Sequence, residues 1–190
     1  VCTNNNKLRT LALPQQAPQL KKLDLSTCPF ISSVNLKGMP RLEYLDLSGL
    51  ALTELDLSQN LELTYLVAGK SFMGVITQLT LPSPSKLQTV ILPYIGLTKL
   101  DLSGSPLLET LMVSYSESLS ELNLTGLDKL KFLDCQGCAF TQLDLSGCSN
   151  LEVLACNNNS LTELNGSNMK RLKDVACYSN KLKKIDLSGC

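Results

Sequence analysis

The chain has 190 residues and 17 basic and 17 acidic side chains, so its formal net charge is zero. This balance excludes the net basic surface that sequence-independent binding to nucleic acid or to an anionic membrane requires. The absence of His excludes Ser-His-Asp hydrolases, Cys-His nucleophiles and His-bearing zinc sites. Leu accounts for 42 residues and Ile for only 5, which indicates a single packing solution used repeatedly.

A repeat of 21 to 24 residues runs through the chain. Each unit begins with LxxLx(L/C/V/A), in which the first, fourth and sixth residues face inward as in a short strand. The pattern predicts a partial coil over residues 1–19, with Val1 standing where Leu154 stands. Eight further coils are predicted to start at Leu20, Leu42, Leu63, Leu87, Leu108, Leu130, Leu151 and Leu172. We therefore expect about nine coils in one domain over residues 1–190.

The second half of the unit is also periodic, reading LTELDLS at Leu52 and LTKLDLS at Leu97. Its inward Leu or Ile side chains predict a second wall across a shared core, and 21 residues per turn leave no room for a full α-helix there. One solvent-facing position of this wall carries Asp or Asn: Asp56, Asp101, Asp144 and Asp186, with Asn35, Asn123 and Asn165 in other coils. We expect these side chains to close turns by bonding local backbone groups; a row of Ca²⁺ ligands is the less favoured alternative.

The pattern resembles the leucine-rich repeat family, and within it the 21-residue, cysteine-bearing repeats of internalin J and of surface proteins of gut Bacteroidetes. Residues 151–167 and 172–188 match the unit LxxLxCxxNxLTxLDLS most closely. The resemblance implies a right-handed solenoid with a parallel β-sheet on its concave face, and short strands or turns with little or no α-helix on its convex face. It also implies that the Asn at the ninth position of a coil bonds backbone groups, a position assigned here to Asn6, Asn159 and Asn180.

The eight cysteines are compatible with disulfides or with a metal site. The Cys-x-x-Cys motif at 135–138, together with Cys148 and Cys156, has a zinc-like spacing. The repeat register favours free structural thiols. The sixth position of three successive coils is held by Cys135, Cys156 and Cys177. We expect these to stack as a ladder of buried thiols, at a torsion that disfavours disulfides. Cys2, at a fifth position, is expected to face solvent.

The face of the predicted sheet collects the exposed aromatic side chains. The second, third, fifth, seventh and eighth residues of each coil point to this face, and all five tyrosines fall among them. The candidate partner-binding residues are Tyr44, Tyr65, Val67, Ile91, Tyr94, Met112, Tyr115 and Phe132. Tyr and Met are enriched where proteins bind partners, which favours a binding surface. Cross-strand packing alone is the alternative.

No catalytic constellation is present, and the sequence indicates no enzyme, no cofactor and no metal site. The resemblance implies a protein recognition or adhesion module, at the cell surface or secreted, that binds a host or bacterial surface protein on the concave face. A glycan-binding surface protein and a structural spacer for another domain are the alternatives.

The hydropathy and the two ends of the chain bear on membrane insertion, secretion and self-association. No apolar run approaches the length of a membrane span, and the chain opens with a polar stretch rather than a signal peptide. Neither end carries a distinct capping segment. Because an uncapped solenoid exposes its core in cross-section, we expect either a fragment of a longer protein or ends covered by end-to-end self-association.

Overall fold

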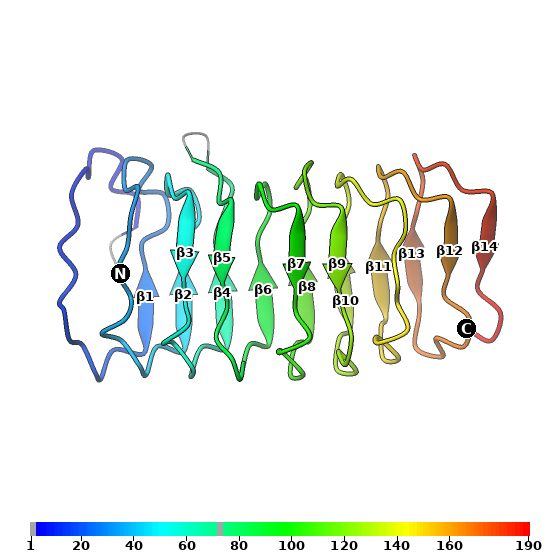
Figure 1. Ribbon diagram of the computed structural model, residues 1–190, viewed down its shortest axis with the longest axis horizontal. Coiled ribbons are helices and arrows are strands. Elements are labelled where there is room, and N and C mark those ends of the chain that lie inside the picture. Colours follow the sequence, from blue (N-terminus) through cyan, green and yellow to red (C-terminus); the bar gives the residue numbers. More distant parts are fainter. Residues whose placement is uncertain (1–2, 72–73) are drawn as a thin grey trace.

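The computed structural model describes residues 3–71 and 74–190, which wind into a parallel β-solenoid (Figure 1). All fourteen strands of this part of the chain are three residues long, and it contains no helix. No described segment is therefore a long apolar helix of the kind that crosses a membrane. The expected architecture, a parallel sheet on one wall and short strands and turns on the other, is confirmed.

The large sheet contains one strand from each of eight coils. In order across the sheet, its strands are β1 (Lys22–Asp24), β2 (Tyr44–Asp46), β4 (Tyr65–Val67), β6 (Thr89–Ile91), β8 (Thr110–Met112), β10 (Phe132–Asp134), β11 (Val153–Ala155) and β13 (Asp174–Ala176). Every strand begins at the third residue of its predicted coil, and neighbours pair in register, as Val90 does with Leu111. The side chains at one repeat position therefore form a row along the solenoid.

The number of coils differs from the expectation of nine. Residues 3–19 contain no strand, and the large sheet has eight strands. Val1 and Cys2, expected at the fourth and fifth positions of the N-terminal coil, lie outside the described residues. The segment after them nevertheless packs on the first complete coil, because Leu8, Leu11 and Leu13 contact the core as partly buried side chains.

The register of this N-terminal segment also differs by one residue. The backbone N–H of Asn4 donates to the carbonyl of Ser26 at 3.1 Å, just as the eighth residue Thr27 donates to Ser48 at 2.8 Å. Asn4 has the positive φ of an eighth residue as well. The ladder bond therefore places Asn4 at the eighth position and the next residue at the ninth, so the assignment of Asn6 to the ninth position is wrong.

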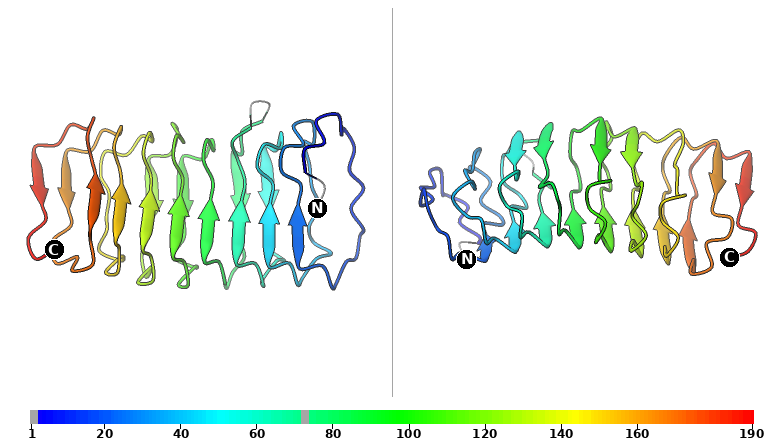
Figure 2. Two further views of the ribbon diagram at one scale, coloured as in Figure 1. Left: turned by 180° about the vertical axis from the view of Figure 1, so that it is seen from behind. Right: turned by 60° about the horizontal axis from the view of Figure 1, so that its bottom comes forward.

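The second wall is interrupted. It contains three separate pairs of parallel strands: β3 (Glu54–Asp56) with β5 (Gln78–Thr80), β7 (Lys99–Asp101) with β9 (Glu121–Asn123), and β12 (Glu163–Asn165) with β14 (Lys184–Asp186). Residues 33–37 and 141–146, at the same place in two other coils, form no strand. Figure 2 shows the continuous sheet and these shorter pairs on opposite sides of the solenoid.

The core between the walls consists mainly of Leu from both halves of the unit. Inward residues such as Leu45, Leu66 and Leu111 of the large sheet and Leu57 and Leu102 of the second wall are fully buried. Phe140 is the one fully buried aromatic side chain among the described residues. The predicted inward positions of both walls are thus confirmed.

Turns on both walls are closed by the same short bond. On the second wall, Asp101 accepts the N–H of Ser103 at 2.9 Å, and Asn123 accepts that of Thr125 at 3.1 Å. Asp24 and Asp46 of the large sheet accept the N–H of the serine two residues on in the same way. The expected turn-closing role of the recurrent Asp and Asn is confirmed.

The Asn at the ninth position ties together backbone groups of two coils. The amide of Asn159 donates to the carbonyl oxygens of Cys135 at 2.9 Å and Cys156 at 3.1 Å, and its oxygen accepts the N–H of Phe140 at 3.1 Å. Asn180 makes the corresponding bonds one coil later. These bonds confirm the role that the family resemblance implied for both residues.

Six of the described cysteines are free thiols: Cys135, Cys138, Cys148, Cys156, Cys177 and Cys190. Cys135 and Cys156 are buried and Cys177 is partly buried, each directly after a strand of the large sheet. Burial raises the pKa of Cys135 well above the usual thiol value and raises the pKa of Cys156 to about 12. Cys135 and Cys156 are therefore protonated and unreactive at neutral pH. Their stacking as a continuous ladder stays a prediction.

The core is open at the C-terminal end of the solenoid. Ile185 in β14 is 48% exposed, whereas its partner Leu164 in β12 is 2% exposed. Leu187, also at an inward position of the last coil, is 41% exposed. The expectation of a longer chain or of self-association stays a prediction.

Candidate functional site

The middle of the large sheet carries a row of apolar side chains on its outer face. Val67, Ile91 and Met112 are register partners at the fifth position of three successive coils, and each is partly exposed. Their neighbours at the third position, Thr89 and Thr110, are uncharged. We call Val67, Ile91 and Met112 the apolar row.

A carboxylate lies at each end of the apolar row. Asp46 is the register partner of Val67, and Asp134 is the register partner of Met112. Asp24 pairs with Asp46 one strand further out. The fifth-position row therefore runs from two carboxylates through three apolar side chains to a third carboxylate.

Two tyrosines stack beside the first pair of carboxylates. The rings of Tyr44 and Tyr65 are 4.7 Å apart between centroids and nearly parallel, at 6°. The ammonium of Lys22 lies 4.1 Å from the centroid of the Tyr44 ring, which forms a cation–π contact. The pKa of the Tyr44 hydroxyl is raised by burial and then by the negative charge of Asp46. This corner of the face is thus aromatic and locally anionic.

A second stacked pair lies along the rim of the sheet. Tyr94 and Tyr115 occupy the eighth position of adjacent coils, with ring centroids 5.2 Å apart, and are 47% and 43% exposed. Both have a φ of 58°, a left-handed conformation that favours Gly or Asn and costs a residue such as Tyr about 1–2 kcal/mol. Gly137 makes room beside them, since a Cβ there would lie 2.8 Å from the Tyr115 ring.

The left-handed conformation belongs to the repeat. All eight coils place a positive φ at the eighth position, in Thr27, Gly49, Lys70, Tyr94, Tyr115, Gly137, Asn158 and Ser179. Its N–H continues the ladder to the next coil, as Tyr94 does to Ser114 at 3.0 Å. Sequence reasoning missed this constraint, although the Gly and Asn at three of these positions were a signal for it.

Charges at the second position of the coils are paired with one another. Lys21 contacts Glu43, Lys131 contacts Glu109 and Lys173 contacts Glu152, each with a nitrogen to oxygen distance of 2.7 Å. The two coils between these pairs carry Thr64 and Gln88 at the same position. The middle of this edge therefore presents no unpaired charge.

The structure brings the sequence-predicted site residues into three groups. Tyr44 with Tyr65 forms one stack, Tyr94 with Tyr115 forms another, and the apolar row lies across the same strands. Phe132 stands apart from the tyrosines, paired in register with Thr110 and Val153. The assignment of all eight residues to partner binding remains a hypothesis.

Sequence reasoning also missed a polar network beside Tyr115. Gln136 donates through its backbone N–H and its amide to Asp134, at 3.2 and 3.3 Å. Its amide oxygen accepts from the Tyr115 hydroxyl at 3.4 Å and from the buried Asn157 at 3.2 Å. These bonds fix the Asp134 carboxylate and the Tyr115 ring in relation to each other. They depend on contacts between three coils, which no single repeat unit reveals.

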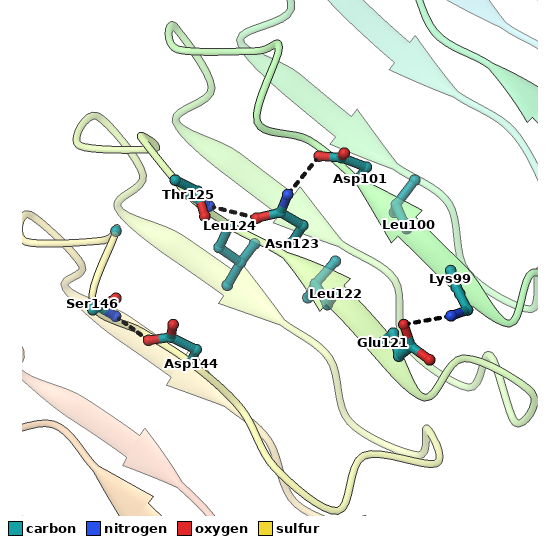
Figure 3. A pocket seen from close by; sticks show the side chains of 11 residues that line it. Lys99, Leu100, Asp101, Glu121, Leu122, Asn123, Leu124, Thr125, Asp144 and Ser146 are labelled. Atoms are coloured by element: carbon teal, nitrogen blue, oxygen red, sulfur yellow. Dashed lines mark hydrogen bonds and ion pairs between the residues drawn. The ribbon is translucent and has the colours of Figure 1, made fainter.

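A hollow of about 370 Å³ lies on the opposite wall, where residues 141–146 leave the strand arrangement (Figure 3). Its polar groups bond each other: Lys99 contacts Glu121 at 2.8 Å, and Asn123 donates to Asp101 at 3.0 Å. Asp144 accepts the N–H of Ser146 at 2.9 Å. The described residues contain no cluster of three or more His, Cys, Asp or Glu arranged to hold a metal ion. The hollow is lined by turn-closing and ion-paired groups.

Solved structures show what this solenoid is similar to. The functional domain of InlJ from Listeria monocytogenes, described as including a cysteine ladder, is 28% identical with a TM-score of 0.78. The match covers 89% of this chain and 37% of that one. An internalin from the same organism, InlF, is 17% identical with a TM-score of 0.64, over 89% of this chain and 54% of that one, and this likeness concerns the fold alone. No protein-family model and no curated protein matches the sequence.

Proposed function

We propose that this chain, whose sequence pattern and fold are those of a leucine-rich repeat protein similar to internalins, is a non-enzymatic module that binds a partner protein. The module corresponds to the single domain expected over residues 1–190. Its binding surface is the outer face of the large sheet, and its place is the cell surface or the extracellular space of a bacterium. The chain spans 37% of the length of the InlJ domain that it matches, so this role is proposed for the chain itself.

The observation that carries the proposal is the apolar row. Apolar and aromatic side chains with neutral neighbours are the usual centre of a protein interface, and charged residues are depleted there. Val67, Ile91 and Met112 are partly exposed on three paired strands, and the flanking second-position charges are already paired. Such a surface loses little solvation of charge when a partner covers it.

The backbone of the two rim tyrosines supports the same surface. Tyr94 and Tyr115 hold a conformation that Gly or Asn would adopt with less strain, and both remain exposed. Strained residues that are kept at exposed positions point to a role outside folding. Their large rings with polar tips suit contact with a protein partner.

Glycan binding is the weaker alternative because two of the four stacked rings, those of Tyr44 and Tyr115, are contacted on both faces. Lys22 covers one face of Tyr44 and Tyr65 covers the other. Tyr115 stacks on Tyr94 on one side and lies against Gly137 on the other. A glycan array on the unmodified protein tests this alternative: specific binding would favour it over protein recognition.

The proposal is tested by replacing the face while leaving the core intact. The variant Tyr65→Ser, Ile91→Ser, Met112→Ser and Phe132→Ser removes the apolar surface. A partner is first identified by crosslinking the immobilised wild-type chain to host or bacterial surface proteins. It is then purified, and its Kd is measured for each variant. We expect the Kd to rise at least 100-fold, because interface anchors contribute about 2 kcal/mol or more each.

The matched control carries three changes on the opposite wall, Gln78→Ser, Lys99→Ser and Glu121→Ser, at the exposed first residues of β5, β7 and β9. This control should bind as the wild type does. Thermal unfolding of both variants verifies that they are folded. Undiminished affinity in the folded face variant would show that the partner binds elsewhere.

A further inference from the structure

The fifth-position row has a charge pattern that the apolar row alone does not explain. Its side chains run Asp24, Asp46, then the apolar row, then Asp134, and these are register partners along six adjacent strands. No ion pair in the described part of the chain includes any of the three carboxylates. Their negative charge is therefore not cancelled by a cation of the chain in direct contact.

At one end, two carboxylates stand side by side. Asp24 and Asp46 pair in register, so neighbouring strand spacing of about 4.8 Å separates their backbones. Each accepts the N–H and the hydroxyl of the serine two residues on, which leaves oxygen lone pairs for another donor. Like charges at this spacing are unfavourable unless a cation offsets them.

The same corner already accommodates a cation. The Lys22 ammonium lies over the Tyr44 ring at 4.1 Å, and the stacked Tyr65 ring extends this aromatic surface toward the apolar row. Carboxylates combined with aromatic faces attract ammonium and guanidinium groups. A further cation arriving from a partner would meet Asp46 and the Tyr65 edge of this corner.

At the other end, Asp134 is only 5% exposed, yet the groups that donate hydrogen bonds to it are neutral. Gln136 donates to it twice and links it to the hydroxyl of Tyr115. Beyond Asp134 the row continues with Ala155 and Ala176, whose small side chains leave space on this side. A nearly buried carboxylate without a cationic partner is costly, and a charge-assisted bond from a partner would relieve that cost.

We propose that the face of the large sheet binds an extended protein segment with apolar side chains at its centre and a Lys or Arg on each side. This inference rests on the proposed function and names the chemistry of its partner. The apolar side chains of the segment cover Val67, Ile91 and Met112. One cation approaches Asp46 and the other approaches Asp134.

The spacing follows from the sheet. Asp46 and Asp134 are four strands apart, which corresponds to about 19 Å at 4.8 Å per strand. An extended segment advances about 3.3 Å per residue, so about six residues cover this length. In such a segment, residues i, i+2, i+4 and i+6 share one face. The segment that fits best has cations at i and i+6 and apolar residues at i+2 and i+4.

The experiment uses three synthetic peptides on the whole chain. Their central sequence is Ser-Leu-Ser-Leu-Ser, flanked on both sides by Lys, by Gln or by Glu. Fluorescence anisotropy gives the Kd of each. We expect the Lys-flanked peptide to bind about tenfold more tightly than the Gln-flanked one, a ratio that we call the Lys advantage, since each of the two charge pairs should contribute about threefold. The Glu-flanked peptide should bind most weakly. Higher salt should reduce the Lys advantage.

The matched variants change charge without changing the turns. Asp24→Asn with Asp46→Asn should lower the Lys advantage from about tenfold to about threefold, because the charge pair at Asp134 remains. The turns should be kept, since Asn closes the same turn elsewhere in the chain, as Asn35 and Asn123 do. Asp56→Asn with Asp101→Asn makes the same change in net charge on the opposite wall and should leave the Lys advantage unchanged.

Three other results would contradict a partner segment with apolar residues flanked by cations. Equal affinity for the Lys-flanked and Gln-flanked peptides, with loss of both on Ile91→Ser, would refute the cationic partner and leave the proposed binding face standing. No binding of any peptide refutes the extended segment, while the partner experiment of the proposed function stands separately. A Lys advantage lost equally in both double Asn variants would reduce the effect to net charge.

Discussion

The two walls of the solenoid share one repeat period but differ in continuity. The large sheet joins eight strands without a break, whereas the second wall has three isolated strand pairs among the described residues. The exposed side chains differ too. The middle of the large sheet presents an uncharged apolar row, and the hollow on the second wall is lined by polar groups that bond one another. A regular core therefore does not dictate which side chains the surface presents.

Core substitutions at matched positions give the largest effect and test the difference in continuity. Leu111 at the centre of β8 is fully buried, whereas Leu122 at the centre of β9 is only partly buried. We expect Leu111→Ala to lower the free energy of unfolding by about 2–5 kcal/mol through lost burial and a residual cavity. Leu122→Ala should cost clearly less. Urea unfolding followed by circular dichroism measures both, and equal losses would mean that the walls pack equally well.

Tyrosine substitutions give an intermediate effect and separate folding from binding on the large sheet. Tyr94→Asn loses a stacked ring contact of about 0.5–1.5 kcal/mol but relieves left-handed strain of about 1–2 kcal/mol. Its stability should therefore stay within about 1 kcal/mol of the wild type. Tyr65→Asn, in an extended strand, loses its stack without any relief and should be destabilised by about 1 kcal/mol.

Affinity for the identified partner distinguishes the two roles of Tyr94. We expect Tyr94→Asn to weaken partner binding although it leaves stability nearly unchanged. A variant that binds with wild-type affinity would mean that the exposed pair of Tyr94 and Tyr115 serves packing alone.

Acid sensitivity gives the smallest effect and concerns the second wall. Hydrogen bonds from Ser103 and Ser146 lower the pKa values of Asp101 and Asp144 below the ordinary carboxyl value, and bonds from Ser58 and Ser188 do so for Asp56 and Asp186. The ionised forms therefore stabilise the fold above the ordinary carboxyl pKa of about 4, and this contribution is lost as the pH falls through the lowered values.

Changing these four residues to Asn keeps the turn bonds and removes the titration. The stability of this variant, measured by urea unfolding from pH 6 to pH 2, should fall less steeply below about pH 4 than that of the wild type. An unchanged slope would show that other carboxyls determine the acid sensitivity.

Much of the fold was predictable because each coil repeats one local rule. Leu at alternate inward positions predicted where every strand of the large sheet begins, and the Asp and Asn of the second wall predicted its turn-closing bonds. The register of the N-terminal segment was not predictable, because its polar residues carry no inward pattern and the ladder bond from Asn4 to Ser26 decides it.

The candidate site was predictable only in part. The positions of Tyr65, Ile91 and Met112 on one face follow from the period of two in a strand. The strained backbone of Tyr94 and the network around Gln136 do not, because both arise from bonds to a neighbouring coil. Sequence alone also gave no sign that residues 141–146 would leave the strand arrangement, since they repeat the pattern of their neighbours.

By itself, the sequence determined the solenoid, its core and the identity of the side chains on each wall, because a local pattern of inward Leu leaves one way to bury them. The tertiary structure alone decided which of those side chains meet. Stacking of coils in register brought the apolar row between carboxylates, paired the second-position charges and held two tyrosines in a left-handed turn. These features depend on distances between coils, and such distances are set only when the whole chain packs.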